Sequence, residues 1–159
     1  MKEIIIIAAV AENNIIGKDG KIPWHIKEDF QHFKELTMGC PCIMGDKTYE
    51  SLPIKPLPGR ENIVLTFDKN YHPKGAIIKY SFEDALEYCK NNEKIFIIGG
   101  ASIYKQGLKF ANRMELTRIH KNYEGDTYFP EFDENEWIIE KKEDHDGFSF
   151  ITYVKKGGN

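Results

Sequence analysis

The sequence predicts an α/β fold: a central, mostly parallel eight-stranded sheet with flanking helices and a C-terminal antiparallel hairpin. Segments with strand-like and helix-like patterns alternate along most of the 159 residues, which is typical of parallel strands joined by helices. Residues 4–7 and 95–98 are continuous apolar runs, as expected of central strands that are covered on both faces. The last two strand-like segments have no helix between them, so we expect them to pair as a hairpin.

Each strand is predicted from apolar alternation or from a short apolar run. The eight segments are residues 4–10, 41–44, 62–66, 76–80, 94–98, 114–119, 137–142 and 148–155. The first segment directly follows a glutamate and is short. We therefore interpret it as a buried strand and not as a signal peptide.

Each helix is predicted from apolar residues that recur at a spacing of three or four. The four segments are residues 26–37, 47–52, 81–91 and 102–111. Ser81 is expected to cap the third helix, because Asp84 follows it in a pattern similar to a capping box. No repeat or linker interrupts these segments, so we expect residues 1–159 to form a single domain.

The composition is that of an ordinary globular protein and excludes several classes of partner. Hydrophobic residues make up 41% of the chain and the net charge is −3, which gives no electrostatic reason to expect nucleic acid or a membrane surface. The three cysteines lack paired spacing and the five histidines are scattered. We therefore expect reduced thiols, a cytoplasmic location and no metal site.

Asp29 is the one charged residue on the apolar side of the predicted helix 26–37. At about 100° per residue, that apolar side consists of Ile26, Phe30, Phe33, Leu36 and Thr37. The opposite, solvent-facing side consists of Lys27, Glu28, Gln31, His32, Lys34 and Glu35. A buried carboxylate without a partner costs several kcal/mol, so Asp29 is expected to accept a hydrogen bond, take up a proton or bind a ligand.

Two strand-to-helix junctions share a glycine-containing design. The strand 41–44 ends at Gly45, with Thr48 close behind it, and the strand 94–98 ends at Gly99 and Gly100, with Ser102 opening the next helix. Glycine lets a ligand approach the backbone, and a helix N-terminus offers free amides. Two such junctions favour a ligand with a pyrophosphate group, although neither is a GxGxxG or a Walker sequence.

Together with Asp29, an ordered set of short motifs resembles the dihydrofolate reductase family over nearly the whole chain. In chain order the motifs are Ile7-Ala8-Ala9-Val10, Ile16-Gly17, Ile22-Pro23-Trp24, Asp29-Phe30 with Phe33-Lys34, Ile43-Met44-Gly45 with Thr48 and Glu50-Ser51, Leu57-Pro58-Gly59-Arg60, Ile97-Ile98-Gly99-Gly100 with Tyr104, Leu116-Thr117, and Gly125-Asp126-Thr127 with Phe129-Pro130. The resemblance implies reduction of 7,8-dihydrofolate to 5,6,7,8-tetrahydrofolate by hydride transfer from NADPH. It also implies binding of antifolate inhibitors, and we expect a monomer because nothing marks an exposed interface.

The resemblance assigns catalytic roles to three residues. Asp29 would grip the amidine-like edge of the pterin ring with both oxygens and favour protonation of the ring, with water delivering the proton. Thr117 would hydrogen-bond the same carboxylate. Trp24 would form a wall of the pocket and help to hold a water molecule.

The resemblance also implies residues that bind the substrate and the cofactor. Those expected to bind the substrate are Ile7, Ala8, Phe30, Phe33, Leu52, Leu57, Arg60 and Ile98, with Arg60 on the glutamate α-carboxylate. Those expected to bind the cofactor are Ala9, Ile16, Gly17, Gly45, Asp46, Lys47, Thr48, Ser51, Leu65, Thr66, Phe67, Gly99, Gly100, Ala101, Ser102, Ile103, Tyr104 and Thr127. The segment 11–21 is similar to a lid over the nicotinamide, and Gly125 and Asp126 would brace it.

The chain departs from the family pattern at the expected phosphate site. Asp46 stands where relatives usually have arginine, and Phe67 stands where a basic or hydroxylated residue is usual. An anion repels a phosphate, whereas aspartate near a ribose hydroxyl favours NAD. Two explanations stay open: a lysine at 47, 69 or 79 compensates and NADPH is preferred, or the preference is weakened and NADH competes.

Two other functions are also consistent with this architecture. One is a reductase that acts on another pteridine or pyrimidine ring, such as the reductase of riboflavin synthesis. Arg60 and Asp29 argue against it, because a substrate without the glutamate tail does not need this arginine. The other is a non-catalytic nucleotide-binding domain, against which the intact Asp29, Trp24 and Thr117 argue.

Overall fold

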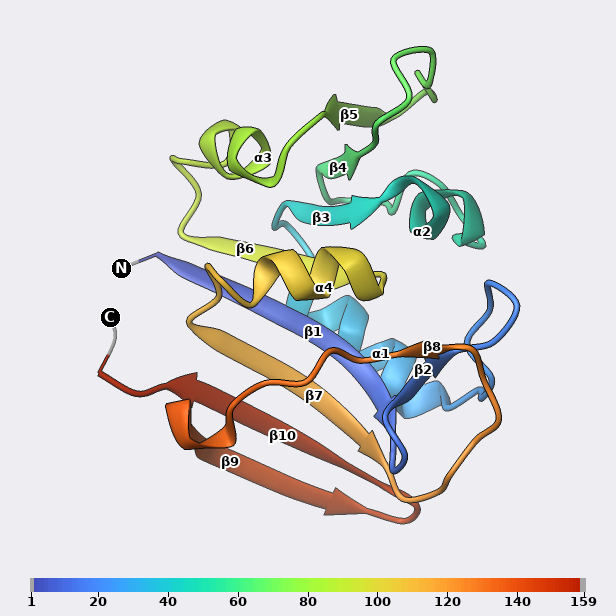
Figure 1. The fold of residues 1–159 in the computed structure, drawn as a ribbon, viewed down its shortest axis with the longest axis vertical. Coiled ribbons are helices and arrows are strands. Elements are labelled where there is room, and N and C mark those ends of the chain that lie inside the picture. Colours follow the sequence, from blue (N-terminus) through green and yellow to red (C-terminus); the bar gives the residue numbers. More distant parts are fainter. Residues whose placement is uncertain (1, 158–159) are drawn as a thin grey trace.

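Eight strands form one sheet in the order β5-β4-β3-β6-β1-β7-β10-β9 (Figure 1). This computed structural model describes residues 2–157. The strands are β1 (Glu3–Ala11), β3 (Cys42–Gly45), β4 (Asn62–Leu65), β5 (Ala76–Lys79), β6 (Lys94–Gly99), β7 (Arg113–Ile119), β9 (Trp137–His145) and β10 (Phe148–Lys155). All eight predicted strands are therefore present in one sheet.

The pairing confirms the mostly parallel arrangement and the terminal hairpin. In the sheet order, the six strands β5, β4, β3, β6, β1 and β7 run parallel to one another. β10 is antiparallel to both β7 and β9. The strands β1, β3, β6 and β7 end toward the right in Figure 1, and this carboxyl edge is where α/β sheets bind ligands.

A second, two-stranded sheet was not predicted. Strand β2 (Ile15–Gly17) pairs antiparallel with β8 (Thr127–Tyr128). A short 3-10 helix, η1 (Glu134–Glu136), precedes β9. Strands of three and two residues are too short to show an alternating pattern, so the sequence alone does not reveal them.

Four α-helices accompany the sheet: α1 (Lys27–Thr37), α2 (Asp46–Ser51), α3 (Phe82–Tyr88) and α4 (Ala101–Gly107). The predicted ends of the last two helices, at residues 91 and 111, were wrong, because turns follow both helices. The predicted cap of α3 is confirmed, since the Ser81 hydroxyl accepts a hydrogen bond from the backbone N–H of Asp84 at 3.0 Å.

The helices cover both faces of the sheet and create a core on each. In Figure 1, α4 lies in front of the sheet and α1 lies behind it. On the α3 and α4 side, Ile6 and Val10 of β1 are fully buried in one cluster. Ile5 and Ile7 alternate to the other side, where Phe33 and Leu36 of α1 pack against them and their neighbours. Burial on both faces explains the continuous apolar run of β1.

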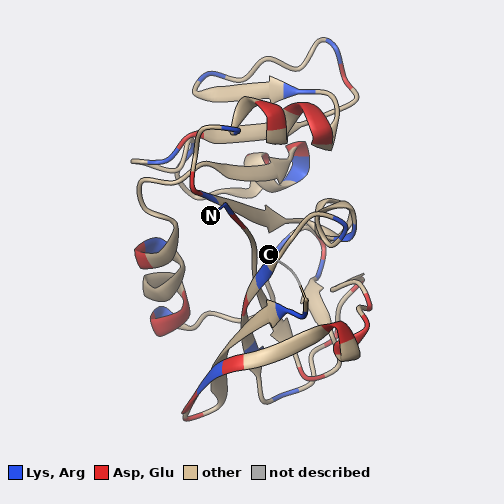
Figure 2. Ribbon diagram, turned by 90° about the vertical axis from the view of Figure 1, so that its left-hand side faces the viewer, with Lys and Arg blue, Asp and Glu red and all other residues tan. Residues whose placement is uncertain are grey.

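The charged residues and cysteines are distributed as the composition suggested. Acidic and basic residues are interspersed over the helices and the C-terminal hairpin in Figure 2. Cys40, Cys42 and Cys89 are free thiols. Among residues 2–157, no helix has the length and apolarity to cross a bilayer, and no group of His, Cys, Asp and Glu side chains could hold a metal ion.

Candidate active site

Asp29 and Thr117 form the polar centre of the site. Asp29 lies in the first turn of α1, and Thr117 lies on β7, beside Ala9 of β1. The Thr117 hydroxyl donates a hydrogen bond of 2.6 Å to Oδ1 of Asp29. Among residues 2–157, no group donates a hydrogen bond to Oδ2 of Asp29, so this oxygen is available to a ligand.

The environment of Asp29 acts on its protonation in two directions. Burial raises the pKa of the Asp29 carboxyl above its ordinary value, while the Thr117 hydrogen bond and the nearby His32 oppose that rise. Because desolvation is the largest of these effects, the carboxylate gains from any cationic or hydrogen-donating ligand that replaces lost water.

Trp24 lies close to the start of α1 and is almost completely buried. It packs in a cluster with Ala11, Ile15 and Phe148, and its ring centroid is 5.0 Å from that of Tyr123. Trp24 therefore joins the segment before α1 to the lid and to the loop after β7.

Several apolar side chains that were predicted to bind the substrate come from α1 and from the loop after α2. Phe33, Leu52 and Leu57, which were expected to bind the substrate, are half-buried and pack against the cluster on the α1 side of the sheet. Phe30 is different: it belongs to the predicted apolar side of α1, yet its side chain is 45% exposed. Its ring lies 4.9 Å from that of His25, and its expected role in binding the substrate stays a prediction.

Arg60 lies beyond this apolar group, in the loop between α2 and β4. Its Nη1 donates to the Thr37 hydroxyl at 3.0 Å, and its Nε donates to the carbonyl of Pro58 at 2.9 Å. Thr37 is fully buried at the end of α1. No carboxylate among the described residues forms an ion pair with Arg60, so its charge is held in place without a protein counter-ion.

The two glycine-containing junctions lie side by side at the carboxyl edge, because β3 and β6 are neighbours. A Cβ added at Gly100 would lie only 3.6 Å from the Thr48 hydroxyl. A Cβ at Gly99, whose φ is +112°, would lie 3.1 Å from the Tyr104 ring. The Gly100 contact joins the two junctions, while Gly99 needs glycine because of its positive φ and the close Tyr104 ring.

The structure gives Asp46 a partner. The Thr66 hydroxyl, at the end of β4, donates a hydrogen bond of 2.8 Å to Oδ2 of Asp46. The adjacent Phe67 is 94% exposed. Of the lysines considered as compensation, Lys69 lies 3.5 Å above the Tyr80 ring and Lys79 lies 5.0 Å from the Tyr88 ring.

Several residues expected to bind the cofactor are part of the protein interior. Leu65, Ile103 and Tyr104 are buried in the hydrophobic core. The Tyr104 hydroxyl lies 2.8 Å from the carbonyl of Ile7 and 3.0 Å from that of Ile98. These side chains support the site from inside, and their role in binding stays a prediction. Other residues expected to bind the cofactor are Ala9 on β1, Lys47 and Ser51 on α2, and Ala101 and Ser102 on α4, while Ala8, expected to bind the substrate, is also on β1.

The segment expected to be a lid is joined to the loop before β8. Besides the pairing of β2 with β8, the backbone N–H of Asp19 donates to Oδ2 of Asp126 at 3.0 Å, and the N–H of Asp126 donates to the Gly17 carbonyl at 3.1 Å. Ile16 and Gly17 thus lie on β2 and Thr127 on β8, as parts of one small sheet. The predicted brace is present.

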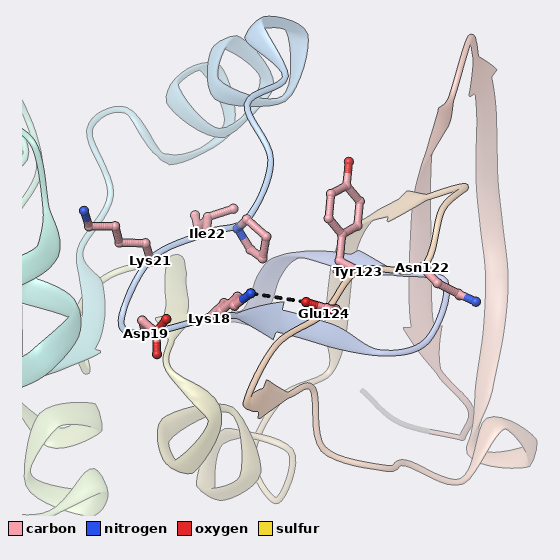
Figure 3. A pocket seen from close by; sticks show the side chains of 8 residues that line it. Lys18, Asp19, Lys21, Ile22, Asn122, Tyr123 and Glu124 are labelled. Atoms are coloured by element: carbon pink, nitrogen blue, oxygen red, sulfur yellow. Dashed lines mark hydrogen bonds and ion pairs between the residues drawn. The ribbon is translucent and has the colours of Figure 1, made fainter.

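An open hollow of about 660 Å³ lies between the lid and the loop after β7 (Figure 3). Its rim carries an ion pair of 3.4 Å between Lys18 and Glu124, and the ring of Tyr123 stands beside it. None of the predicted substrate-binding residues lines this hollow. We therefore assign it to the outer side of the lid and not to the substrate site.

His32 is the residue near the site that the sequence analysis misplaced. It was expected on the solvent-facing side of α1, but it is half-buried and its ring stacks on Phe150 of β10, with 3.8 Å between centroids. Its position three residues after Asp29 was the available signal, since residues at this spacing are neighbours on a helix.

Comparison with known proteins gives a consistent result. Residues 3–155 match the family model described as "Dihydrofolate reductase". The chain is 44% identical to a dihydrofolate reductase of Neisseria gonorrhoeae, over 98% of this chain and 100% of the relative. It is 39% identical to one from Bacillus subtilis, over 98% and 96% of the two chains. A solved dihydrofolate reductase from Enterococcus faecalis, complexed with NADP(H) and RAB-propyl, superimposes with a TM-score of 0.89 at 32% identity, covering 97% of this chain and 96% of its own.

Proposed function

The chain belongs to the dihydrofolate reductase family, and we propose that its catalysis depends on the Asp29 carboxylate hydrogen-bonded by Thr117. The reaction is reduction of 7,8-dihydrofolate to 5,6,7,8-tetrahydrofolate with NADPH. The two alternatives, a reductase of another ring and a non-catalytic nucleotide-binding domain, are not supported by these relatives. The observation that carries the proposed role of Asp29 is its 2.6 Å hydrogen bond to Thr117 together with its free Oδ2.

Asp29 binds and orients the pterin ring in this proposal. The ring presents an edge of two N–H donors, which an ionised carboxylate can accept together. Thr117 fixes the carboxylate on Oδ1, so its plane is set before the substrate arrives. Preorganised groups of this kind lower the barrier because they need no rearrangement during the reaction.

Asp29 also favours protonation of the ring. NADPH, when bound, supplies the hydride, and a proton must reach the ring nitrogen next to the carbon that accepts it. A negative charge in a desolvated site stabilises the positive charge that develops on the ring. Trp24 walls the pocket and helps to hold the water molecule that delivers the proton.

The tail of the substrate extends toward Arg60 in this proposal. Phe30, Phe33, Leu52 and Leu57 supply an apolar slot for the aromatic ring. The Arg60 guanidinium is already anchored to Thr37 and Pro58, which leaves Nη2 and the charge for the α-carboxylate. A forked, anchored cation loses little conformational freedom when it binds.

The residues at the carboxyl edge fit a dinucleotide. The junctions at Gly45 and at Gly99–Gly100 are adjacent because β3 and β6 are neighbours, and the helix N-termini there present backbone amides. Asp46 is the exception, since a carboxylate near a phosphate is repulsive. We propose that NADPH is used and that NADH is tolerated to a measurable degree.

The family binds dihydrofolate and antifolate inhibitors. We propose that this chain acts as a monomer in the cytoplasm. Binding of the antifolate methotrexate should quench the fluorescence of Trp24, measured in a Trp137→Phe background so that one tryptophan reports. A Trp24 signal unchanged by saturating methotrexate would contradict the placement of Trp24 in the pocket wall.

The test of the proposed function is the Asp29→Asn variant, assayed for NADPH-dependent dihydrofolate reduction. Asparagine still accepts the Thr117 hydrogen bond, but it removes the charge and one acceptor oxygen. We expect kcat near neutral pH to fall by about a hundredfold or more, with the Kd for NADPH nearly unchanged. The control is Asp146→Asn, the same change in the exposed turn between β9 and β10. Full activity of Asp29→Asn would remove Asp29 from the mechanism.

A further inference from the structure

A second titratable side chain lies on the same face of α1 as the proposed catalytic carboxylate. His32 follows Asp29 by three residues, so the two side chains are neighbours on the helix. The His32 ring stacks on Phe150, with 3.8 Å between centroids and 13° between planes. The mechanism described above makes no use of it.

His32 and Asp29 contact the sheet at neighbouring points. Asp29 accepts its hydrogen bond from Thr117 on β7, while His32 stacks on Phe150 of β10. Thr117 and Phe150 are direct cross-strand partners in the antiparallel β7–β10 pair. Helix α1 therefore contacts one cross-strand pair of the sheet at two adjacent points, through a hydrogen bond to Thr117 and an aromatic stack on Phe150.

We propose that His32 is a positioning residue for Asp29: its ring holds α1 in the register that places Asp29 on Thr117, and its protonation in acid stabilises the ionised Asp29 carboxylate. This inference rests on the proposed function of Asp29.

The charges around His32 all favour the imidazolium. They come from Asp29 and Glu35 on α1, Glu115 on β7 and Glu143 on β9, while β10 contributes the neutral Phe150 ring. Burial is the stronger effect and lowers the pKa of His32 below its ordinary value, whereas the four carboxylates raise it. His32 is thus neutral near pH 7 and becomes charged in acid, the range in which Asp29 also titrates.

The coupling between the two groups must be reciprocal. A protonated His32 lowers the pKa of Asp29, and an ionised Asp29 raises the pKa of His32. Because the same free energy acts on both titrations, removal of either group shifts the titration of the other. The functional consequence is that Asp29 stays ionised at lower pH than its burial alone would allow.

The first measurement is an NMR titration of the ligand-free protein. The His32 ring signal is expected to titrate at lower pH in Asp29→Asn than in the unmodified protein. The His145 ring, which packs against the same Phe150 ring with 5.1 Å between centroids, serves as the internal reference signal. In the reverse experiment, His32→Phe keeps an aromatic ring but removes the charge. The Asp29 carboxyl carbon should then titrate at higher pH, with the ratio of ionised to protonated carboxyl at pH 5 about threefold lower.

The second measurement is the rate of hydride transfer in a single turnover. It distinguishes the effect of the His32 ring from the effect of its charge. At pH 7, His32→Ala should lower the rate about tenfold, because a small displacement of a positioned group costs this much or more. The His32→Phe variant should transfer hydride at the rate of the unmodified protein at pH 7. Its rate should be lower than that of the unmodified protein only in acid. His72→Phe, the same change in an exposed loop, is the matched control, and His32→Tyr, which also keeps an aromatic ring without the charge, replaces His32→Phe if the latter does not fold.

The outcomes distinguish this inference from the proposed function. If Asp29→Asn keeps full activity, the proposed function is wrong. If Asp29→Asn is inactive but both titrations are independent of the partner residue, only the electrostatic half of the present inference is overturned. A His32→Ala variant with unchanged hydride transfer at pH 7 would overturn the positioning half.

Discussion

At the scale of single residues, burial and hydrogen bonding act against each other on Asp29. Burial raises the pKa of its carboxyl, and the Thr117 hydroxyl lowers it. The folded protein therefore holds an ionised group at neutral pH in a place that favours the neutral form. A ligand that donates two hydrogen bonds relieves this penalty, so part of the binding energy is stored before the substrate arrives.

The Asp29→Asn variant should therefore be more stable than the unmodified protein at neutral pH. A carboxyl whose folded pKa is raised stabilises the fold only below its unfolded pKa, and this contribution is lost as the pH rises through the folded pKa. We expect the variant to gain roughly 2 to 4 °C in Tm at pH 7 and to lose the gain toward pH 3. Calorimetry across this pH range measures the difference, and a lower Tm at pH 7 would contradict it.

Arg60→Leu should impair substrate binding much more than turnover. The lost charged hydrogen bonds are expected to raise KM for dihydrofolate about tenfold to a hundredfold, while kcat falls little, because the contact lies far from the reacting ring. Steady-state kinetics with a dihydropterin that lacks the glutamate tail provides the control, since both proteins should reduce it equally well.

Asp46→Asn tests the departure at the phosphate site. Asparagine keeps an acceptor for the Thr66 hydroxyl but removes the negative charge. The ratio of kcat/KM for NADPH over NADH should rise about threefold to tenfold. An unchanged ratio would mean that Asp46 does not face the phosphate and that the NADPH preference is set elsewhere.

The sequence could predict the residues whose chemistry conflicts with their surroundings. Asp29 on an apolar helix face is such a residue. Thr117 and Arg60 were predicted from the order of the family motifs along the chain. The sequence could not predict that His32 is half-buried or that Phe30 is exposed. The burial of His32 depends on its stacking on Phe150 of β10, which lies more than a hundred residues further along the chain.

At the scale of elements, the two-stranded sheet of β2 and β8 joins the segment expected to be a lid to the loop after β7. Asp126 hydrogen-bonds Gly17 and Asp19, and Gly125 packs closely against Ile15 and Gly17. A Cβ at Gly125 would lie 2.5 Å from the Gly17 carbonyl oxygen and 2.6 Å from Ile15 Cγ2. The backbone of the lid can approach this closely only because residue 125 has no side chain.

Gly125→Ala should therefore loosen the lid without unfolding the sheet. We expect amide exchange at Ile15 and Gly17 to accelerate about tenfold or more, while exchange in β1 and β6 stays slow. Gly17→Ala is the matched control for exchange, because its added Cβ would make only an ordinary contact of 3.4 Å with Thr127. Equal protection in the two variants would mean that the lid is not held by this contact.

The sequence predicted the elements that carry a long local pattern. The eight main strands and four helices each show alternation, an apolar run or helical spacing. β2 and β8 do not, since their pairing joins segments more than a hundred residues apart and depends on the loop geometry around Asp126. The ends of α3 and α4 were missed for a related reason, because apolar residues continue past Tyr88 and Gly107 and pack from turns.

At the scale of the whole molecule, the residues predicted to bind substrate and cofactor come from the main sheet, from α1, α2 and α4, from the loop before β4 and from the small β2–β8 sheet. Bound ligands would connect α1, the two glycine junctions and the lid. Saturation with NADPH, at about 100 times its Kd, should therefore raise Tm by about 5 to 10 °C. Thermal unfolding monitored at β9, on the far side of the sheet, should report the same shift. A shift confined to the lid would show that the sheet does not unfold as one unit.

The strand order also has a consequence for folding of the chain during its synthesis. β1 is synthesised first, yet it lies between β6 and β7, so its backbone has no sheet partner until the ribosome has translated residues 94–119. During that interval the run Ile4–Ile7 emerges as an unpaired apolar strand, a segment prone to aggregation. We expect the nascent chain to depend on chaperones until β6 appears, and force profiles of stalled ribosomes should show the main folding transition only after β7 has left the exit tunnel.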